Sequence, residues 1–208
     1  SVNLANSRAN ILYTSTILGN NLGVSLGVAL SLKLKKKNEM TCVITGDGAI
    51  EEGSFYETLL FMSSHNLPGL IIIENNGWSL GSRITERRTN IDVNSLAKTF
   101  NLSYLKLRGN DVFDYIKKLS LGYFNAFKLQ RALIVEVKLD TLGDWTLTNN
   151  ENPNGKYINY HAGPAPEVKY ENNLIIKNNS KDPIYVLQKK YGKKLITQMS
   201  SDIKRLIK

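Results

Sequence analysis

The sequence has few of the residues that build disulfide-rich or membrane-spanning proteins. Among its 208 residues are two histidines and one cysteine, Cys42. A single cysteine cannot form an internal disulfide. Cys42 falls in an apolar run, and we expect it to be a small buried core residue. No apolar run approaches the ~20 residues that span a bilayer, and the start lacks a signal-peptide pattern. We therefore expect a soluble, cytoplasmic protein with no membrane partner.

The charge of the chain is positive but dispersed. The formal net charge is +9 at pH 7, from 27 Lys and Arg against 18 Asp and Glu. Such a balance can indicate binding to nucleic acid or to an anionic membrane. However, the sequence has no concentrated basic stripe and no RNA-recognition aromatic motif. A solvated surface explains the charge better, and we predict no nucleic-acid partner.

The stretch at 46–78 and the run before it have the pattern of a strand, a glycine turn, a helix and a second strand. Apolar, β-branched runs at 40–45 (MTCVIT) and 70–73 (LIII) suit buried parallel strands. Between them, apolar residues recur at helical spacing, at Phe55, Leu59, Leu60 and Met62. This order of elements predicts one βαβ unit.

A polar side chain follows each of these two strands. Asp47 comes after the first strand and Asn76 after the second, at the carboxyl ends where open α/β sheets bind ligands. Carboxylate and amide oxygens suit Mg²⁺, which usually binds together with substrate phosphates. Gly48 and the start of the following helix suit a phosphate group. Gly-Asp-Gly alone is usually a tight turn and Asn-Asn-Gly a loop, but together on one βαβ unit they favour a metal diphosphate site.

The same stretch carries a family resemblance. GDG at 46–48, followed after 49–74 by Asn75 and Asn76, resembles the thiamine diphosphate motif. More narrowly, GDGAIEEGSFYETLLFMSSHNLPGLIIIENNGWS resembles the alpha chain of the dehydrogenase component of 2-oxo acid dehydrogenase complexes. The resemblance implies thiamine diphosphate and Mg²⁺ as cofactors, and Mg²⁺ ligands from the side chains of Asp47 and Asn76 and the backbone carbonyl of Trp78. It implies further cofactor contacts from Gly46, Gly48 and Ala49.

Two more segments correspond to parts of that family's active site. By the resemblance, Leu18 and Gly19 lie near the aminopyrimidine ring of the cofactor, although a helix start with a glycine for close packing explains them about equally well. His161, in YHAGP at 160–164, is similar to a histidine on a loop at the cofactor and substrate. It is the predicted catalytic residue of this chain.

Charged residues near the motif have two interpretations each. Glu51 and Glu52 could act as acid or base groups, but first-turn carboxylates at a helix N-terminus are the better interpretation. The run SLGSRITERRTN at 79–90 falls where a mobile loop covers the active site in the family. Its arginines are expected either to meet a substrate carboxylate or sugar phosphate or to belong to a solvated basic loop.

Strand and helix patterns continue to alternate along the rest of the chain. A helix is predicted from about 22, and helices and strands follow in turn at 93–101, 104–107, 112–127 and 132–139. This alternation predicts an α/β fold with a doubly wound, mainly parallel sheet and helices on both faces, which is the thiamine diphosphate-binding fold. We expect 1–208 to be a single diphosphate-binding domain, with a long active-site loop at about 140–170 and C-terminal helices at about 182–208.

The resemblance also implies a partner. Activation of thiamine diphosphate needs a glutamate beside the aminopyrimidine, which in this family comes from a beta chain, and no residue here is an evident candidate. We therefore expect a beta-type, pyrimidine-binding subunit in a two-fold αβ assembly, a heterotetramer, that decarboxylates a 2-oxo acid and transfers the acyl or aldehyde group. The alternatives are the amino-terminal half of a split transketolase, acting on sugar phosphates, and a non-catalytic α/β binding module. The family's alpha chains also have a long upstream segment that contributes further diphosphate contacts and is not in this sequence. Either it was removed, or another chain supplies those contacts, or the affinity for the cofactor is reduced.

Overall fold

The computed structural model describes residues 5–142, 144–150, 152–159 and 174–207. By their contacts these form two compact units. The first consists of Ser1–Leu107 and Lys118–Lys138, and the second of Arg108–Lys117 and Leu139–Lys208. The long helix at 112–129 takes part in both. The expectation of one domain over 1–208 stays a prediction.

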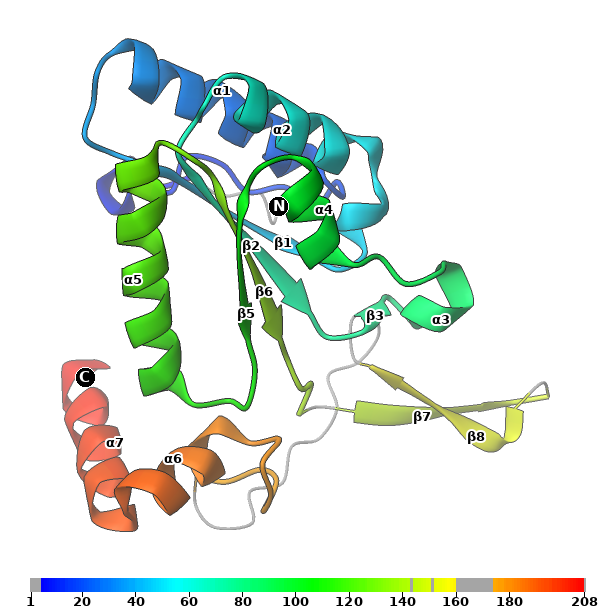
Figure 1. Ribbon diagram of the computed structural model, residues 1–208. Coiled ribbons are helices and arrows are strands. Elements are labelled where there is room, and N and C mark those ends of the chain that lie inside the picture. The colour runs from blue at the N-terminus through cyan, green and yellow to red at the C-terminus, as the bar shows by residue number, and fades with distance from the viewer. Residues whose placement is uncertain (1–4, 143, 151, 160–173, 208) are drawn as a thin grey trace. The chain divides into compact units, whose positions relative to one another are not determined.

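The first unit contains a four-stranded sheet in which every pair of neighbours is parallel (Figure 1). The strand order is β1-β2-β6-β5. The strands are β1 (Thr41–Gly46), β2 (Gly69–Asn75), β5 (Ser103–Leu107) and β6 (Leu133–Lys138). Each was predicted to within two residues at its ends, and for β1, β2 and β6 the signal was an apolar run rich in β-branched residues, which is typical of parallel strands.

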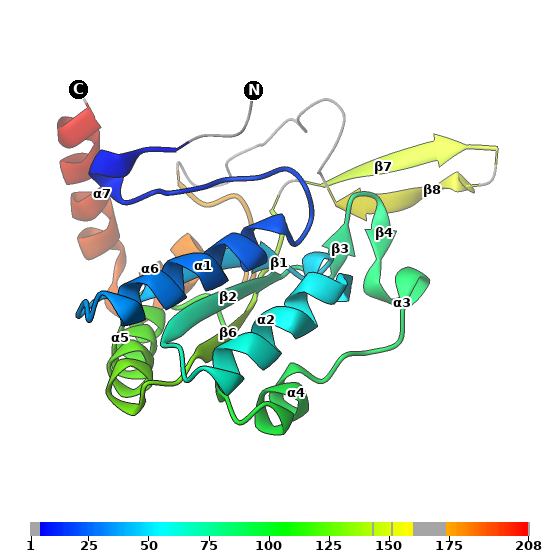
Figure 2. The same ribbon diagram turned by 90° about the horizontal axis from the view of Figure 1, so that it is seen from above.

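Helices cover both faces of this sheet, as predicted. The α1 helix (Asn20–Leu34) and the α2 helix (Gly53–Ser64) lie side by side on one face (Figure 2). The α4 helix (Val93–Thr99) shares their core. The α5 helix (Val112–Leu129) packs on the opposite face through Gly122, where an added Cβ would lie 2.8 Å from Leu133 Cδ2. The sheet is therefore doubly wound.

The core lies between α1, α2, α4 and one face of the sheet. Phe55, Leu59 and Met62 are fully buried on α2, which confirms the helix that their spacing predicted. Leu60, the fourth residue of that pattern, is 57% exposed. On β2, Ile71 and Ile73 are fully buried against them. Burial of a side chain of this size contributes roughly 1.5–3 kcal/mol each, so this face fixes the βαβ unit that carries the strand ends.

The other face of β1 is not part of this core, so the expectation for Cys42 was wrong. Along β1 burial alternates, with Thr41, Val43 and Thr45 turned inward. Cys42 is exposed, and Ile44 is 56% exposed. The reason is that β1 is an edge strand while α5 packs over the β5–β6 side of the sheet. A continuous apolar run cannot show which face of a strand is covered.

Short elements follow the two strand ends that carry the motif. The 3₁₀ turn η2 (Ala49–Glu51) lies between β1 and α2. After β2, a small ladder joins β3 (Trp78–Ser79) to β4 (Ser82–Arg83), and the one-turn helix α3 (Ile84–Arg87) follows. The 3₁₀ turn η1 (Ser7–Ala9) lies near the start of the chain. None of these elements was predicted.

The second unit contains a hairpin and two helices. The hairpin pairs β7 (Asp144–Asn149) with β8 (Asn152–Asn159), so much of the segment expected to be a loop at about 140–170 is regular structure. The C-terminal helices are α6 (Pro183–Tyr191) and α7 (Lys193–Ile207). Asp182 caps α6 by accepting a hydrogen bond from the Ile184 amide at 2.8 Å. In the described part of the chain, no helix has the length and apolar character needed to cross a membrane.

Candidate functional site

The carboxyl ends of β1 and β2 bring the two predicted metal ligands to one edge of the sheet. Gly46 pairs with Glu74 in the β1–β2 register, and the Asp47 amide donates to the Glu74 carbonyl at 3.2 Å. Asp47 is therefore level with Asn75, one residue before Asn76. The structure places both polar residues at the same edge of the sheet, because parallel strands end at a common edge.

Asp47 is a buried carboxylate with one oxygen left without a donor. Its exposed fraction is 2%, and Oδ2 makes no hydrogen bond to the described residues. The nearest cation is Arg87, whose Nη2 lies 3.7 Å from Oδ2. Burial raises the pKa of Asp47, and the charges of Arg87, Arg88 and Lys138 offset part of that rise. A buried polar oxygen without a partner is uncommon and is what a metal ligand would leave in a protein chain taken alone.

Asn76 forms a turn that also positions Trp78. Its Oδ1 accepts a hydrogen bond from the Trp78 amide at 2.9 Å, with Gly77 between them at φ +82°. This is the local turn that asparagine side chains favour. An amide oxygen has two lone pairs, so this bond leaves one for a further ligand. Trp78 then enters β3, and the Arg83 guanidinium lies 5.1 Å from its ring centroid.

Two of the predicted glycines are sites of close approach between segments. A Cβ at Gly48 would lie 2.6 Å from Ser79 Oγ, so the glycine turn packs against the chain that follows Asn76. Gly19 has φ +72°, and a Cβ there would lie 2.5 Å from Ser54 Oγ, near the start of α2. The segment before α1 is thus held against the same end of the βαβ unit. Leu18 beside it is 55% exposed.

Glu51 holds two arginines against the glycine turn, which neither interpretation of the sequence anticipated. Arg87 Nη2 lies 2.8 Å from Glu51 Oε1, and Arg88 Nε lies 2.8 Å from the same oxygen. The hydrogen bond from Arg87 lowers the pKa of Glu51. Glu51 lies in η2, not in the first turn of α2, and Glu52 makes no side-chain cap bond. The arginine-rich run is therefore a short helix bound to the motif through ion pairs.

A second buried carboxylate, Glu136 on β6, was missed in the sequence. It is 7% exposed and accepts hydrogen bonds from Tyr104 Oη at 2.5 Å and Asn75 Nδ2 at 2.8 Å. Lys106 Nζ lies 3.3 Å away. Burial alone would raise the pKa of Glu136, but these partners lower it overall. A charged residue inside the apolar strand LIVEVK was the available signal.

Lys138 is a further residue of this edge that was not predicted. It ends β6 and pairs with Asn75 in the β2–β6 register. Its Nζ would lie 3.8 Å from a Cβ added at Gly77, so the ammonium group lies over the Asn-Asn-Gly turn. Its charge is also felt at Asp47. No local pattern indicates this position, since a lysine at a strand end is usually solvated.

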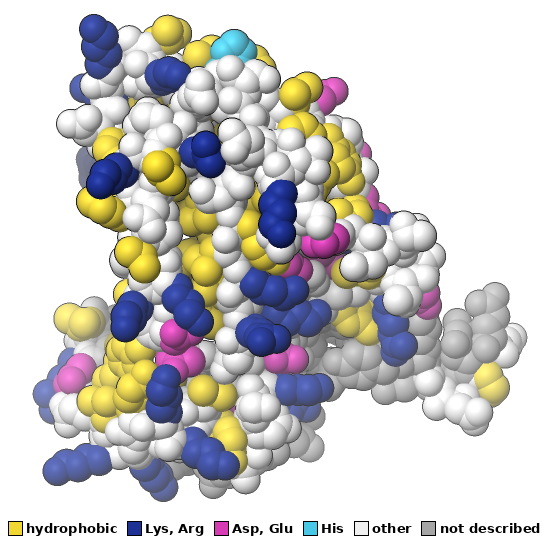
Figure 3. Space-filling model, viewed as in Figure 1, with side chains coloured by type: hydrophobic (Ala, Val, Ile, Leu, Met, Phe, Trp, Pro, Cys, Tyr) yellow, Lys and Arg dark blue, Asp and Glu magenta, His cyan; other side chains and the backbone are white. Residues whose placement is uncertain are grey.

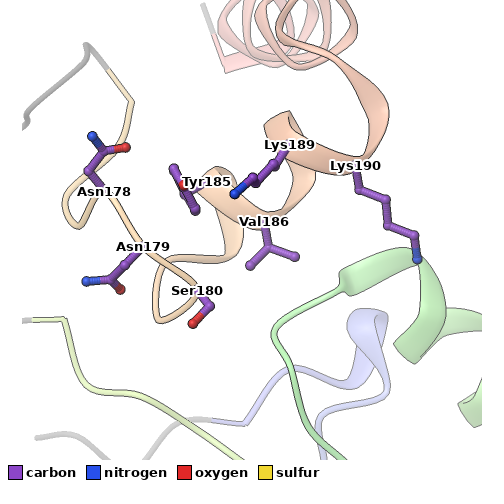
Figure 4. A pocket seen from close by; sticks show the side chains of 7 residues that line it. All are labelled: Asn178, Asn179, Ser180, Tyr185, Val186, Lys189 and Lys190. Carbon is purple, nitrogen blue, oxygen red and sulfur yellow. The ribbon is translucent and has the colours of Figure 1, made fainter.

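The remaining features do not contribute to this geometry. His161 lies outside the described residues, so its role stays a prediction. Within the described ranges, no group of three or more His, Cys, Asp and Glu residues could hold a metal ion. A cavity of about 510 Å³ in the second unit is lined by residues of α6 and the turn before it (Figure 4), and it contains none of the predicted site residues.

Basic side chains on the face in view are spread out, with acidic and apolar side chains among them (Figure 3). This distribution agrees with the interpretation of the +9 charge as a solvated surface. The expectation of no nucleic-acid partner stays a prediction.

Comparison with known proteins identifies relatives of the chain. A family described as "Dehydrogenase E1 component" matches residues 1–118. The chain is 31% identical over 102 residues to the pyruvate dehydrogenase E1 component subunit alpha of Acholeplasma laidlawii, covering 49% of this chain and 30% of that protein. It is 26% identical over 169 residues to the mitochondrial 2-oxoisovalerate dehydrogenase subunit alpha 1 of Arabidopsis thaliana, covering 81% of this chain and 34% of that protein. The chain thus spans about a third of the length of these relatives.

Among solved structures, the chain is similar to the transketolase of Campylobacter jejuni. The TM-score is 0.48 at 20% sequence identity, and the match covers 60% of this chain and 20% of that chain. This likeness is too low to carry an argument.

Proposed function

The chain belongs to the dehydrogenase E1 component family, and from that premise we propose that it is the alpha-type subunit of a thiamine diphosphate-dependent enzyme acting on a 2-oxo acid. The observation that carries the proposal is the buried Asp47 oxygen without a hydrogen bond, at the strand ends beside Asn76. The two curated relatives are both named as alpha subunits of 2-oxo acid dehydrogenases. They favour this function over a split transketolase or a non-catalytic binding module.

The residues at the strand ends fit a magnesium ion. Mg²⁺ prefers oxygen ligands in octahedral geometry and binds one or two carboxylates together with phosphates. The Asp47 and Asn76 side chains and the Trp78 carbonyl would hold it, and the unbonded Asp47 Oδ2 is the oxygen that needs such a partner. Thiamine diphosphate, when bound, supplies an electron sink for breaking the bond between the carboxyl and carbonyl carbons of a 2-oxo acid.

The chain's own residues would bind and orient the cofactor. The glycine turn at Gly46, Gly48 and Ala49 would contact the diphosphate, next to the N-terminal end of α2, where unpaired amides favour an anion. Gly19, which packs against Ser54 near that helix, would place Leu18 and itself toward the aminopyrimidine. His161 is the proposed catalytic residue on the substrate side.

Two other carboxylates near the strand ends are engaged within the chain and are poorly placed to activate the cofactor. Glu51 is engaged by two arginines and Glu136 by three donors. A beta-type subunit in a two-fold αβ assembly is therefore part of the proposal, and it would supply the catalytic glutamate. The compartment proposed for this assembly is the cytoplasm.

Native mass spectrometry on the protein purified from its own cells tests the proposal. We expect a complex that holds a second subunit, thiamine diphosphate and Mg²⁺, and we expect Asp47→Ala to abolish Mg²⁺-dependent binding of the cofactor. Asp202→Ala, which removes an exposed carboxylate on α7, is the matched control and should bind normally. A chain that takes up no thiamine diphosphate with Mg²⁺ and its subunit present would overturn the proposal, as would normal binding by the Asp47 variant.

A further inference from the structure

Three residues on neighbouring strands form a row at the carboxyl edge of the sheet. Asp47 is level with Asn75, and Asn75 pairs with Lys138 on β6. Because side chains alternate along a strand, Asn75 lies on the same face as Ile71 and Ile73, and Lys138 on the same face as Ile134. These three apolar residues belong to one core. Lys138 therefore points to the side of the sheet that is covered by α2, the helix of the βαβ unit.

Lys138 differs from Lys106, the other lysine on this face of the sheet. Lys106 Nζ is paired with Glu136 at 3.3 Å. Lys138 is exposed and, within the described ranges, has no hydrogen bond or ion pair. Of the acids in this region, Glu136 is bound by three donors and Glu51 by two arginines. Asp47, on which the Lys138 charge acts, is a proposed metal ligand. A lysine loses side-chain entropy when it is held in place, and within the described ranges no hydrogen bond or ion pair offsets that loss.

The charge balance at this edge favours an anionic ligand. Lys138, Arg87 and Arg88 act on Asp47 with three positive charges, while Asp47 and Glu51 contribute two negative ones. A bound divalent cation would add two more positive charges beside Lys138, an arrangement that is repulsive unless a polyanion bridges them. The ammonium group lies over Gly77, in the turn between the proposed ligands Asn76 and Trp78. An anion that bridges these positive charges would therefore contact both Lys138 and the metal ion.

We propose that Lys138 binds anionic oxygens of the cofactor's diphosphate, as a second cation beside the metal. This inference rests on the proposed function and extends it to a residue outside the glycine motif. Lysine binds phosphate as a compact point charge with three donors. The contribution is that of a partly solvated charge, so it should decrease as salt is added.

Isothermal titration calorimetry with saturating Mg²⁺ tests the inference, using the full chain together with the subunit that co-purifies with it. The probes are thiamine diphosphate, thiamine monophosphate and unphosphorylated thiamine. We expect Lys138→Gln to weaken binding of thiamine diphosphate about 3- to 10-fold at low salt and to leave thiamine unchanged. Lys138→Arg should recover most of the loss. Lys37→Gln, which removes the same charge between α1 and β1 at the opposite edge of the sheet, should have no effect.

Magnesium binding without the cofactor gives a readout that a merely structural lysine would not produce. Loss of a neighbouring cation should leave Mg²⁺ affinity equal or higher in Lys138→Gln, while affinity for thiamine diphosphate falls. Equal affinity of wild type and Lys138→Gln for thiamine diphosphate would overturn the inference, whether or not the KM for a 2-oxo acid changes. Equal losses for thiamine diphosphate and thiamine would also overturn it. If wild type bound no thiamine diphosphate at all, the proposed function itself would fail.

Discussion

Asp47 and Glu136 are both buried carboxylates near the carboxyl edge of one sheet, but their oxygens have different partners. Glu136, on the β5–β6 side, accepts two hydrogen bonds and an ion pair. Asp47, at the end of β1, leaves Oδ2 without a hydrogen bond. Their pKa values are displaced in opposite directions, since burial raises that of Asp47 while the partners of Glu136 lower its value. The comparison separates an acid whose oxygens are bound within the fold from one that we propose binds a ligand.

The two acids also differ in the kind of structure that surrounds them. Glu136 ties three strands together, through Tyr104 and Lys106 on β5 and Asn75 on β2. Around Asp47, the contacts are made by short segments instead, namely the glycine turn, the two-residue strand β3 with Ser79, and the one-turn helix α3. A site on such segments can rearrange when a ligand binds, whereas the Glu136 network fixes the strand that carries Asn75.

The largest expected effect comes from neutralising the open acid. Asp47→Asn should reduce Mg²⁺-dependent affinity for thiamine diphosphate by at least about 100-fold, because a metal ligand loses its charge. The free energy of unfolding should stay unchanged or rise by about 1 kcal/mol, since a desolvated charge becomes a neutral amide. Calorimetric titration and urea unfolding measure the two quantities. Retained affinity together with a large loss of stability would show that Asp47 is a structural residue like Glu136.

The satisfied acid should give the opposite result. Glu136→Gln should lower the free energy of unfolding by roughly 1–3 kcal/mol at pH 7, because buried donors lose a charged acceptor. The folded-state pKa of Glu136 lies below its ordinary value of 4.5. Its stabilisation is therefore complete above that value and is lost as the pH falls through the folded-state pKa.

Urea unfolding at pH 7 and pH 3 measures this dependence, and the difference between wild type and Glu136→Gln should shrink at pH 3. Tyr104→Phe removes one donor and should cost about 0.5–1.5 kcal/mol. The two substitutions should not be additive, since they share one hydrogen bond. An equal difference at both pH values would contradict the assigned role of the Glu136 charge.

The smallest effect is expected from Glu51, which lies near the proposed ligand site around Asp47 but is paired with two arginines. Glu51→Gln should change the free energy of unfolding by less than about 1 kcal/mol, because this network is partly solvated. Trypsin should nevertheless cleave after Arg87 and Arg88 several times faster, since α3 loses its ion pairs to the glycine turn. Cleavage after Lys37 serves as the internal control, and an unchanged rate at the two arginines would exclude Glu51 as the residue that holds α3.

Several elements could be predicted because their signals are local. The β-branched runs and the 3.6-residue spacing of Phe55, Leu59 and Met62 gave the strands and α2. Asp182 followed by Pro183 gave the start of α6. The β7–β8 hairpin was missed, since its strands lie in a sequence rich in turn-forming residues that reads as a loop. Cys42 was misassigned because an apolar run does not record which face is covered.

Local sequence patterns were sufficient to predict the βαβ unit and the position of Asp47 and Asn76 at its strand ends, because strand and turn propensities act over a few residues and parallel strands share a carboxyl edge. The partners of the charged side chains became known from the folded chain alone. Glu51 meets Arg87 across 36 positions and Asn75 meets Glu136 across 61. Lys138 reaches the turn at Gly77 through the sheet register. Contacts at such separations depend on how the chain folds back on itself, and no local pattern encodes them.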